Sequence, residues 1–407
     1  MTFKKETPST ASLGETAGSA NGASHHESAV STNPGDSASA PAKKIRYAVV
    51  GLGHIAQVAV LPGFERARNA ELVALVSGDR EKLKALKKKY QVRHTYSYQR
   101  FDECLANPEI DAVYIALPND LHADCVIRAA RAGKHILCEK PLALHEREIR
   151  QMAAAARAGG VRLMTAYRLH FEPANLSAIE LVRSGKLGEP RYFNSTFSYQ
   201  VTDTNNIRLK LERGGGPVYD IGTYCINAAR YLMQDEPIEV SAMIARTDDT
   251  RFDEVEESAA VLLRFPRGRL ASFVVSFGAA NCARYELVGT KGSIALDPAY
   301  EYSEALHQTV TIDDESEEKT FDRTDQFGGE IEAFAKCLLE DCDPEPSLEE
   351  GLADVRIIEA IFESAERGCS IRLRPVKKSA RPGRHQMKRK QAVRKPDLVK
   401  VTSPHGD

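Results

Sequence analysis

No stretch of this sequence approaches the roughly 18 consecutive apolar residues that a membrane-spanning helix requires. Its eight cysteines are scattered, form no Cys-x-x-Cys pair and have no histidines at metal-ligand spacing. This pattern favours buried, reduced cysteines over disulfides or zinc, and we see no other metal-ligand cluster. The first 42 residues also lack a continuous apolar run and paired arginines, so we expect a cytoplasmic protein without an export signal.

Both ends of the chain are poor in large apolar side chains. Residues 1–42 are rich in Ser and Ala, which predicts a disordered leader because so little surface can be buried. Residues 375–407 carry ten Lys/Arg against two Asp/Glu, whereas the body has an excess of eight negative charges. We expect a solvated, disordered basic tail; weak contact with nucleic acid or an anionic surface is the alternative, and nucleic acid is not the expected partner. The body between these ends is long enough for two domains.

Residues 43–167 predict an NAD(P)-binding Rossmann domain. An apolar run at 45–50 is followed by Gly51, Gly53 and Ala56, which gives Gly-x-Gly-x-x-Ala at a strand-to-helix turn. These small residues permit a tight turn, close approach of a pyrophosphate and close helix packing, and the helix start offers N–H groups to phosphate. Four more apolar runs, at 71–77, 111–118, 134–140 and 161–167, alternate with helical patterns. The alternation predicts a doubly wound parallel sheet, and the expected phosphate-binding residues are Gly51, Gly53, His54 and Ile55.

The end of the second predicted strand indicates NADP rather than NAD. NAD-binding domains usually place an acidic residue there to bind the ribose hydroxyl, but this chain has Ser77 and Gly78. Arg80 and Lys82 follow, and they can neutralise a 2′-phosphate. Two alternatives stay open: these basic residues are simply solvated, or Asp79 turns inward and binds the free ribose of NAD.

Residues 168–374 predict an α+β domain with a large, open and mostly antiparallel sheet. Five strand-like runs between 238 and 297 are separated by short turns, and two helical segments follow at 325–340 and 348–367. Before them, Asp220, Tyr224 and Asn227 are spaced to share one helix face. A carboxylate, a phenol and an amide together can orient a sugar and move a proton, although Tyr224 as a core tyrosine is the alternative. An open sheet also predicts a homo-oligomer, a dimer or tetramer.

The segments "GLGHIA", "ALPNDLHADCVIRAARAGKHILCEKPLA" and "GGGPVYDIGTYCIN" make the chain resemble a known family. It is similar to the glucose-fructose oxidoreductase and inositol dehydrogenase family (GFO/IDH/MocA) of NAD(P)-dependent sugar oxidoreductases over about residues 44–374. The segment "TAYRLHFEPANLSAIELVRSGKLGEP", the "SGD" turn and a tyrosine where many members have histidine bring it nearest to the glucose-fructose oxidoreductase branch.

The resemblance implies roles for individual residues. Lys140 would lie beside the nicotinamide and bind the reacting oxygen, Tyr224 would act as acid and base, and Asp220 would tune both. The cofactor cleft would be lined by Pro118, Asn119, His122, Glu139 and Lys140. Substrate contacts would come from Lys140, Arg168, His170, Asp220, Tyr224 and Asn227. For His122 a purely structural role is the alternative.

We therefore expect an NADP-dependent enzyme that transfers hydride between a nicotinamide and a sugar or polyol. An ordinary aldose dehydrogenase and a two-sugar oxidoreductase are both compatible with the sequence. The alternative from another class is a non-catalytic, NADP-responsive regulator on the same fold. The presence of both Lys140 and Tyr224 favours the enzyme, because a binding protein needs neither.

Overall fold

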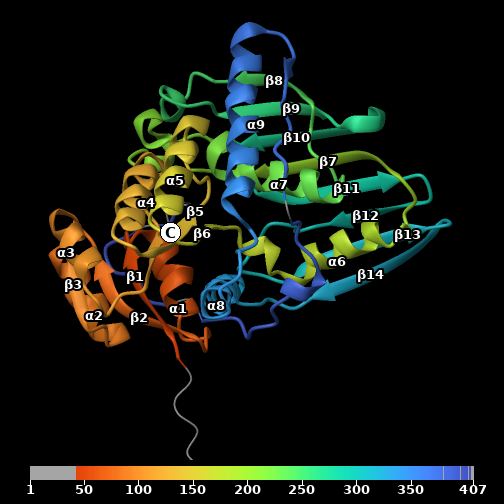
Figure 1. Ribbon diagram of the computed structural model, residues 1–407. Helices are drawn as coiled ribbons and strands as arrows, with labels where there is room; N and C mark the ends of the chain where they lie inside the picture. Colours follow the sequence, from red (N-terminus) through yellow and green to blue (C-terminus); the bar gives the residue numbers. More distant parts are fainter. Residues whose placement is uncertain (1–42, 379, 395, 402, 405–407) are drawn as a thin grey trace, which may run out of the picture. The chain divides into compact units, whose positions relative to one another are not determined.

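The computed structural model describes residues 43–404 apart from positions 379, 395 and 402, so the predicted leader 1–42 lies outside the described residues. The described chain forms one sheet of six strands and one of nine. Figure 1 shows the first sheet among helices α1 to α5, and the second with α6, α7 and α9 over one face. This arrangement confirms the predicted class, a parallel Rossmann-like sheet followed by an α+β region.

The first sheet is parallel throughout, in the order β3-β2-β1-β4-β5-β6. Five of its strands coincide with the five apolar runs of the sequence, whereas β3 is short and half-buried and has no such pattern. The strands are β1 (Ile45–Val50), β2 (Ala70–Val76), β3 (His94–Tyr96), β4 (Ala112–Ile115), β5 (His135–Glu139) and β6 (Leu163–Ala166). The helices around them are α1 (Leu61–Gly63), α2 (Arg80–Tyr90), α3 (Phe101–Ala106), α4 (His122–Arg131) and α5 (Glu146–Ala158).

The second sheet has the order β14-β13-β12-β11-β7-β10-β9-β8-β15, and only its β7–β10 pair is parallel. Inward residues alternate with outward ones along β8, β9 and β10, as expected for a sheet with one covered face. Its strands are β7 (Pro190–Ser198), β8 (Glu239–Ala245), β9 (Ser258–Arg264), β10 (Leu270–Ser276), β11 (Cys282–Gly289), β12 (Gly292–Leu296), β13 (Leu306–Ile312), β14 (Glu315–Phe321) and β15 (Ile371–Arg372). The helices of this region are α6 (Pro173–Arg183), α7 (Thr223–Leu232), α8 (Gln326–Leu339) and α9 (Leu348–Arg367).

Helix α8 crosses the boundary that the sequence suggested between the two regions. Its apolar residues Phe327, Ile331 and Phe334 join the core around β1 and α1, on the first sheet. Figure 1 accordingly shows α8 next to α1. Sequence order alone assigned this helix to the second region, but its apolar face is buried against the first.

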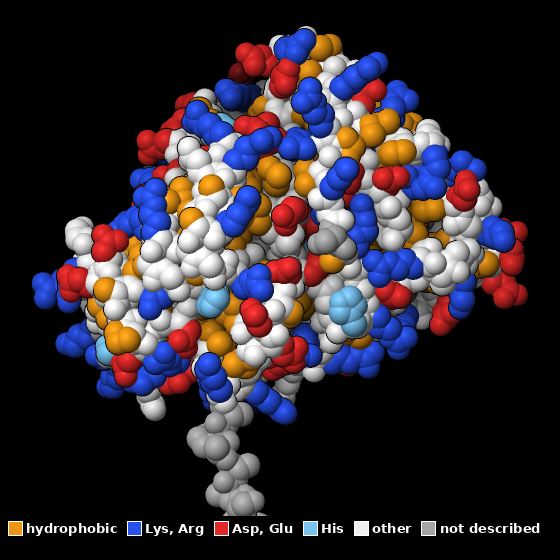
Figure 2. Space-filling model, viewed as in Figure 1, with side chains coloured by type: hydrophobic (Ala, Val, Ile, Leu, Met, Phe, Trp, Pro, Cys, Tyr) orange, Lys and Arg blue, Asp and Glu red, His pale blue; other side chains and the backbone are white. Residues whose placement is uncertain are grey.

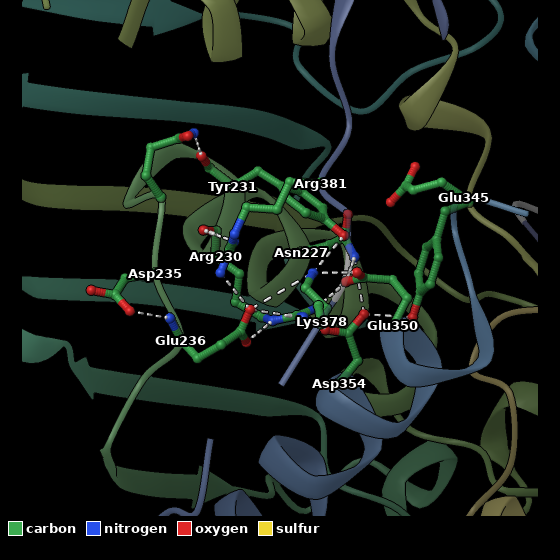
Figure 3. Close-up of polar contacts among 12 residues, drawn as sticks. Asn227, Arg230, Tyr231, Asp235, Glu236, Glu345, Glu350, Asp354, Lys378 and Arg381 are labelled. Atoms are coloured by element: carbon green, nitrogen blue, oxygen red, sulfur yellow. Dashed lines mark hydrogen bonds and ion pairs between the residues drawn. The ribbon is translucent and has the colours of Figure 1, made fainter. Parts of the chain in front are cut away.

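The carboxyl-terminal segment, residues 375–404, does not match the prediction of a solvated, disordered tail. Its described residues lie along the body, and we call it the carboxyl-terminal strap. Lys378, with 4% of its side chain exposed, pairs with the buried Glu350, and Arg381 donates to Glu236 at 2.9 Å (Figure 3). The composition did not predict this because carboxylates of the acidic body bind the basic side chains of the strap, and Met387 and Val399 add apolar contacts with the cores.

Further expectations from the sequence concern membrane-spanning helices, the distribution of surface charge and the cysteines. Among the described residues, no helix is both long and apolar enough to cross a membrane. Lys and Arg side chains are interspersed with Asp and Glu on the face seen in Figure 2. All eight cysteines are free and five are buried as expected, whereas Cys342 and Cys369 are exposed.

Candidate active site

A cavity of about 1020 Å³ lies where the carboxyl ends of the first sheet's strands meet the second region. This is the edge at which open α/β sheets bind their ligands. The structure brings most of the predicted residues together on its wall. These are Gly51, Gly53, His54, Ile55, Ser77, Lys82, Pro118, Asn119, Glu139, Lys140, Arg168, Asp220 and Tyr224.

The turn after β1 has the shape of a phosphate cradle. Gly51 has a φ of +92°, and a Cβ there would lie 2.3 Å from the carbonyl oxygen of Ala116. Gly53 lines the cavity, and a Cβ on it would enter open space. The chain becomes helical at His54, so the N–H groups of the first turn lie next to this space. The donor set and the space beside Gly53 both fit the pyrophosphate of a dinucleotide.

The ribose end of the cavity favours a 2′-phosphate. The Asp79 carboxylate caps α2 by accepting from the backbone N–H groups of Glu81 and Lys82, each at 2.9 Å, and it does not line the cavity. Ser77 and Lys82 do line it, and burial lowers the pKa of the Lys82 ammonium. The predicted Gly78 and Arg80 are exposed and do not line the cavity. Tyr98, which no motif indicated, lies on the wall beside Ser77.

Lys140 reaches across the cavity from the end of β5. Its Nζ donates to the backbone oxygen of Asp220 at 2.7 Å and to its Oδ1 at 2.9 Å. Burial acts to lower the pKa of Lys140, but the Asp220 carboxylate outweighs burial and the pKa is raised, so the side chain is a cation. An ammonium has three N–H donors, and the third can serve a ligand.

Asp220 holds more than one cation. Its Oδ2 accepts from Arg208 Nε at 2.6 Å and from the Tyr199 hydroxyl at 2.9 Å. Burial acts to raise the pKa of Asp220, yet Arg208 and Lys140 hold it well below its usual range. Sequence reasoning missed Arg208 and Tyr199, because Arg208 lies in a short 3-10 helix and Tyr199 directly follows β7, and neither belongs to a recognisable motif.

Tyr224 lies between two cations. Lys140 Nζ and the guanidinium carbon of Arg168 are each 4.8 Å from the centroid of its ring, and Arg168 Nε donates to its hydroxyl oxygen at 3.2 Å. Arg168 is itself fixed by the Tyr300 carbonyl and the Gln326 side chain. The phenol can therefore exchange a proton with a ligand while Arg168 stays bonded to its oxygen.

Besides Gly78 and Arg80, three predicted residues lie outside this cavity. His122 is fully buried, and its ring nitrogens lie 2.9 Å from the Pro141 carbonyl and 3.0 Å from the Leu117 carbonyl, a position that fits the structural alternative. Asn227 donates to Asp354 at 3.0 Å, and its oxygen lies 3.0 Å from His170 Nε2. Both Asn227 and His170 therefore belong to a buried polar cluster and do not face the substrate space.

Glu139 forms a second buried network at the end of β5. Its Oε1 accepts from the Tyr114 hydroxyl at 2.9 Å, and that hydroxyl also lies 2.7 Å from Glu330 Oε1. One hydroxyl has one proton, so both contacts are hydrogen bonds only if a carboxyl group is protonated. Burial raises the pKa of both Glu139 and Glu330, and that of Glu330 well above its usual range. Glu330 belongs to α8, and the sequence did not predict its contact with Tyr114 on β4.

The cradle, the cavity and the Lys140–Asp220–Tyr224 cluster fit a dinucleotide-dependent oxidoreductase. Comparison with known proteins agrees. Residues 45–167 match the model of an oxidoreductase family with an NAD-binding Rossmann fold, and residues 175–295 match the GFO/IDH/MocA C-terminal domain. The chain belongs to the GFO/IDH/MocA oxidoreductase family and is an NAD(P)-dependent enzyme, which confirms the resemblance found in the sequence.

Among its relatives is a D-xylose 1-dehydrogenase [NADP(+)] of Haloarcula marismortui, 32% identical over 81% of this chain and 93% of that protein. An aldose-aldose oxidoreductase from Caulobacter crescentus, solved with glycerol, is 37% identical with a TM-score of 0.78, covering 81% of this chain and all of that one. A 3-ketoreductase from Actinomadura kijaniata, solved with NADP and TDP-benzene, is 27% identical with a TM-score of 0.73, covering 79% and 98%.

Proposed function

We propose that this enzyme uses NADP to transfer hydride between the nicotinamide and a CH–OH group of a sugar or polyol. The observation that carries this proposal is the Lys140–Asp220–Tyr224 cluster, which shares one cavity with the glycine cradle. The names of the relatives support the substrate class, since they include a xylose dehydrogenase and an aldose-aldose oxidoreductase. Residues that would hold the cofactor are Gly51, Gly53, Ser77, Lys82, Pro118 and Asn119.

The bound nicotinamide supplies hydride acceptance and donation. The third N–H of Lys140 donates to the reacting substrate oxygen, and its charge stabilises the alkoxide that develops there. Tyr224 accepts the hydroxyl proton during oxidation and returns it during carbonyl reduction. Arg168, bonded to the phenol oxygen, stabilises that oxygen while the proton is away. Asp220 keeps the Lys140 ammonium in place and charged.

NADP is favoured over NAD by the ribose end of the site. The Asp79 carboxylate is committed to the α2 N-terminus, so it does not offer the ribose contact of NAD-binding domains. Ser77 and Lys82 offer a hydroxyl and a cation to a 2′-phosphate instead. Relatives named or solved with NADP support the same choice.

The test has two parts, on the full chain. Titration with NADP and with NAD should give tighter binding of NADP, and tighter binding of NAD would contradict the assignment. Nicotinamide absorbance, recorded while a panel of aldoses and polyols is added, should then show reduction of NADP by at least one of them. Binding of NADP with no response to any sugar or carbonyl compound would instead favour the regulator.

A further inference from the structure

The carboxyl-terminal strap reaches the cofactor end of the cavity. Ala392, Val393, Ser403 and Pro404 line the cavity together with the residues of the glycine cradle. Most of the cavity wall comes from the two sheets and their loops, whereas these four come from the far end of the chain. The strap therefore contributes to the site itself and not merely to the surface beside it.

A buried glutamine joins the strap to the phosphate cradle. Gln57, with 1% of its surface exposed, donates to the carbonyl of Leu52 at 2.9 Å and to the carbonyl of Val399 at 3.0 Å. Its Oε1 accepts from the Val399 backbone N–H at 2.8 Å. Leu52 lies between the two cradle glycines. One side chain thus ties the backbone of the cradle to the backbone of the strap.

The next strap residue lies at the ribose end. Lys400 pairs with Glu81 and lies 3.7 Å from Asp79 Oδ2. Asp79 follows Ser77 by two residues, so a positive charge from the strap offsets the acidic charge nearest the 2′-phosphate position. Ten residues before Lys400, the strap is attached to α8, because Lys390 Nζ donates to Glu332 at 2.6 Å.

The proximal strap is anchored in a buried ionic cluster. Arg230 is fully buried and pairs with Glu236, Glu350 and Asp354. Figure 3 shows Lys378 and Arg381 of the strap pointing into this cluster, where they supply further positive charge to Glu350 and Glu236. Removing such partners would leave buried carboxylates uncompensated, so this part of the strap is held in place.

We propose that the carboxyl-terminal strap is the outer wall of the dinucleotide site and retains NADP between turnovers. The anchored proximal part fixes the strap, and in the distal part the contacts of Val399 and Lys400 hold Ser403 and Pro404 on the wall of the cofactor cavity. Release of the dinucleotide then requires the Gln57–Val399 and Lys400 contacts to open. The inference rests on the proposed use of NADP, and it adds a structural origin for slow release.

The test compares two full-length variants that alter only the distal part. Val399→Pro removes the N–H that donates to Gln57, and Lys400→Glu reverses the charge beside Asp79. Arg389→Glu is the matched control, since it reverses a charge on the same strap at an exposed position away from the cavity. The measurement is the rate of NADPH dissociation, followed by nicotinamide fluorescence after mixing with excess NADP.

Both distal variants should release NADPH at least about tenfold faster than the wild type, with smaller effects on association, and Arg389→Glu should stay within about twofold. Rates within about twofold of the wild type in both distal variants, or an equal acceleration in the control, would overturn the proposal. If Val399→Pro does not fold, hydrogen exchange of the unaltered protein decides. NADP should protect the amides around Val399, and unchanged exchange would overturn the proposal.

A failure of the strap proposal can be distinguished from a failure of the proposed function. If the wild type binds NADPH and no sugar reacts, the proposed reaction fails while the dissociation rates still test the strap. If sugars react and the distal variants release NADPH at the wild-type rate, the strap proposal alone fails. If the wild type binds no NADPH, both fail.

Discussion

At the scale of single residues, positive charge is concentrated around Tyr224 and Asp220. Lys140 and Arg208 bind the Asp220 carboxylate, and Arg168 binds the Tyr224 hydroxyl. Positive charge at this point of the cavity is costly to bury unless a negative group of the ligand balances it. A developing alkoxide on the substrate supplies that negative charge, which makes the cluster complementary to the transition state more than to the neutral sugar.

Replacing the two groups that act on the substrate oxygen should abolish turnover without abolishing cofactor binding. Lys140→Ala and Tyr224→Phe are each expected to lower kcat by at least about 100-fold, because each removes charge stabilisation or proton transfer in the transition state. NADP affinity, measured by fluorescence titration, should change by only a few fold. Tyr192→Phe on the distant sheet serves as the control. A loss below about tenfold would remove the residue from its assigned role.

The sequence predicted the members of this cluster that belong to motifs and missed those that do not. Lys140 and Tyr224 stand in recognisable segments, and the structure places both in the cavity. Arg208 reaches Asp220 from a short 3-10 helix, and only the folded chain reveals this contact. No feature of the sequence around His122 indicates that both of its ring nitrogens face buried carbonyls.

At the scale of elements, the segment that holds Asp220 and Tyr224 is not a regular α-helix. Residues Val218–Gly222 have π-type hydrogen bonding before α7 begins at Thr223. The wider turn changes the angular spacing of side chains, and such turns are frequent at functional sites. Asp220 and Tyr224 share the cavity, but Asn227, one α-helical turn later, faces α9. The prediction that all three serve one substrate face is not matched by the structure, because Asn227, in the regular part of α7, binds Asp354 of α9.

The start of this π-turn is held by a buried carboxylate. Glu256 Oε1 accepts from the Val218 backbone N–H at 3.1 Å, and Gly216 leaves room for it, since a Cβ there would lie 2.4 Å from the same oxygen. Burial raises the pKa of Glu256 to about 7, from an ordinary value of 4.5. The folded state therefore binds a proton that the unfolded state releases in this range.

Stability should consequently depend on pH through Glu256. Its contribution is fully present below pH 4.5 and is lost as the pH rises through about 7, by at most about 3 kcal/mol. Glu256→Gln cannot ionise, so its Tm relative to the wild type should rise between pH 5 and pH 8.5. The exposed Glu317→Gln should show no such trend. A pH-independent difference between Glu256→Gln and the wild type would contradict this account.

The elements themselves were largely predictable, and the strap was not. Alternating and continuous apolar runs gave most of the strands of both sheets, because burial of one or two faces leaves a pattern in the residues. The strap has no such pattern. Lys378 and Gln386 of the strap are buried because they bind Glu350 and Glu345. These two carboxylates lie close to the strap only in the folded chain.

At the scale of the whole described molecule, the second sheet has an exposed apolar face. Met243 on β8, Leu262 on β9 and Val274 on β10 are 78%, 46% and 45% exposed. The strand register makes them neighbours, since Met243 and Val274 both pair with Ala260, two residues before Leu262. Helices α6, α7 and α9 cover the opposite face (Figure 1). Contiguous exposed apolar side chains favour association, and a flat sheet face is self-complementary about a two-fold axis.

We therefore propose that the protein self-associates through this sheet face, and sedimentation velocity can test it. The wild type is expected to be a dimer or a larger even-numbered assembly at about 10 µM, because burying several large apolar side chains per subunit gives an interface of ordinary strength. Met243→Glu and Leu262→Glu should shift the protein to the monomer, since each buries a charge at the centre of the contact. Leu339→Glu, an equivalent substitution at the end of α8 where the side chain is 37% exposed, should leave the assembly unchanged. A monomeric wild type, or a dimer that both sheet variants leave intact, would show that this face is not the interface.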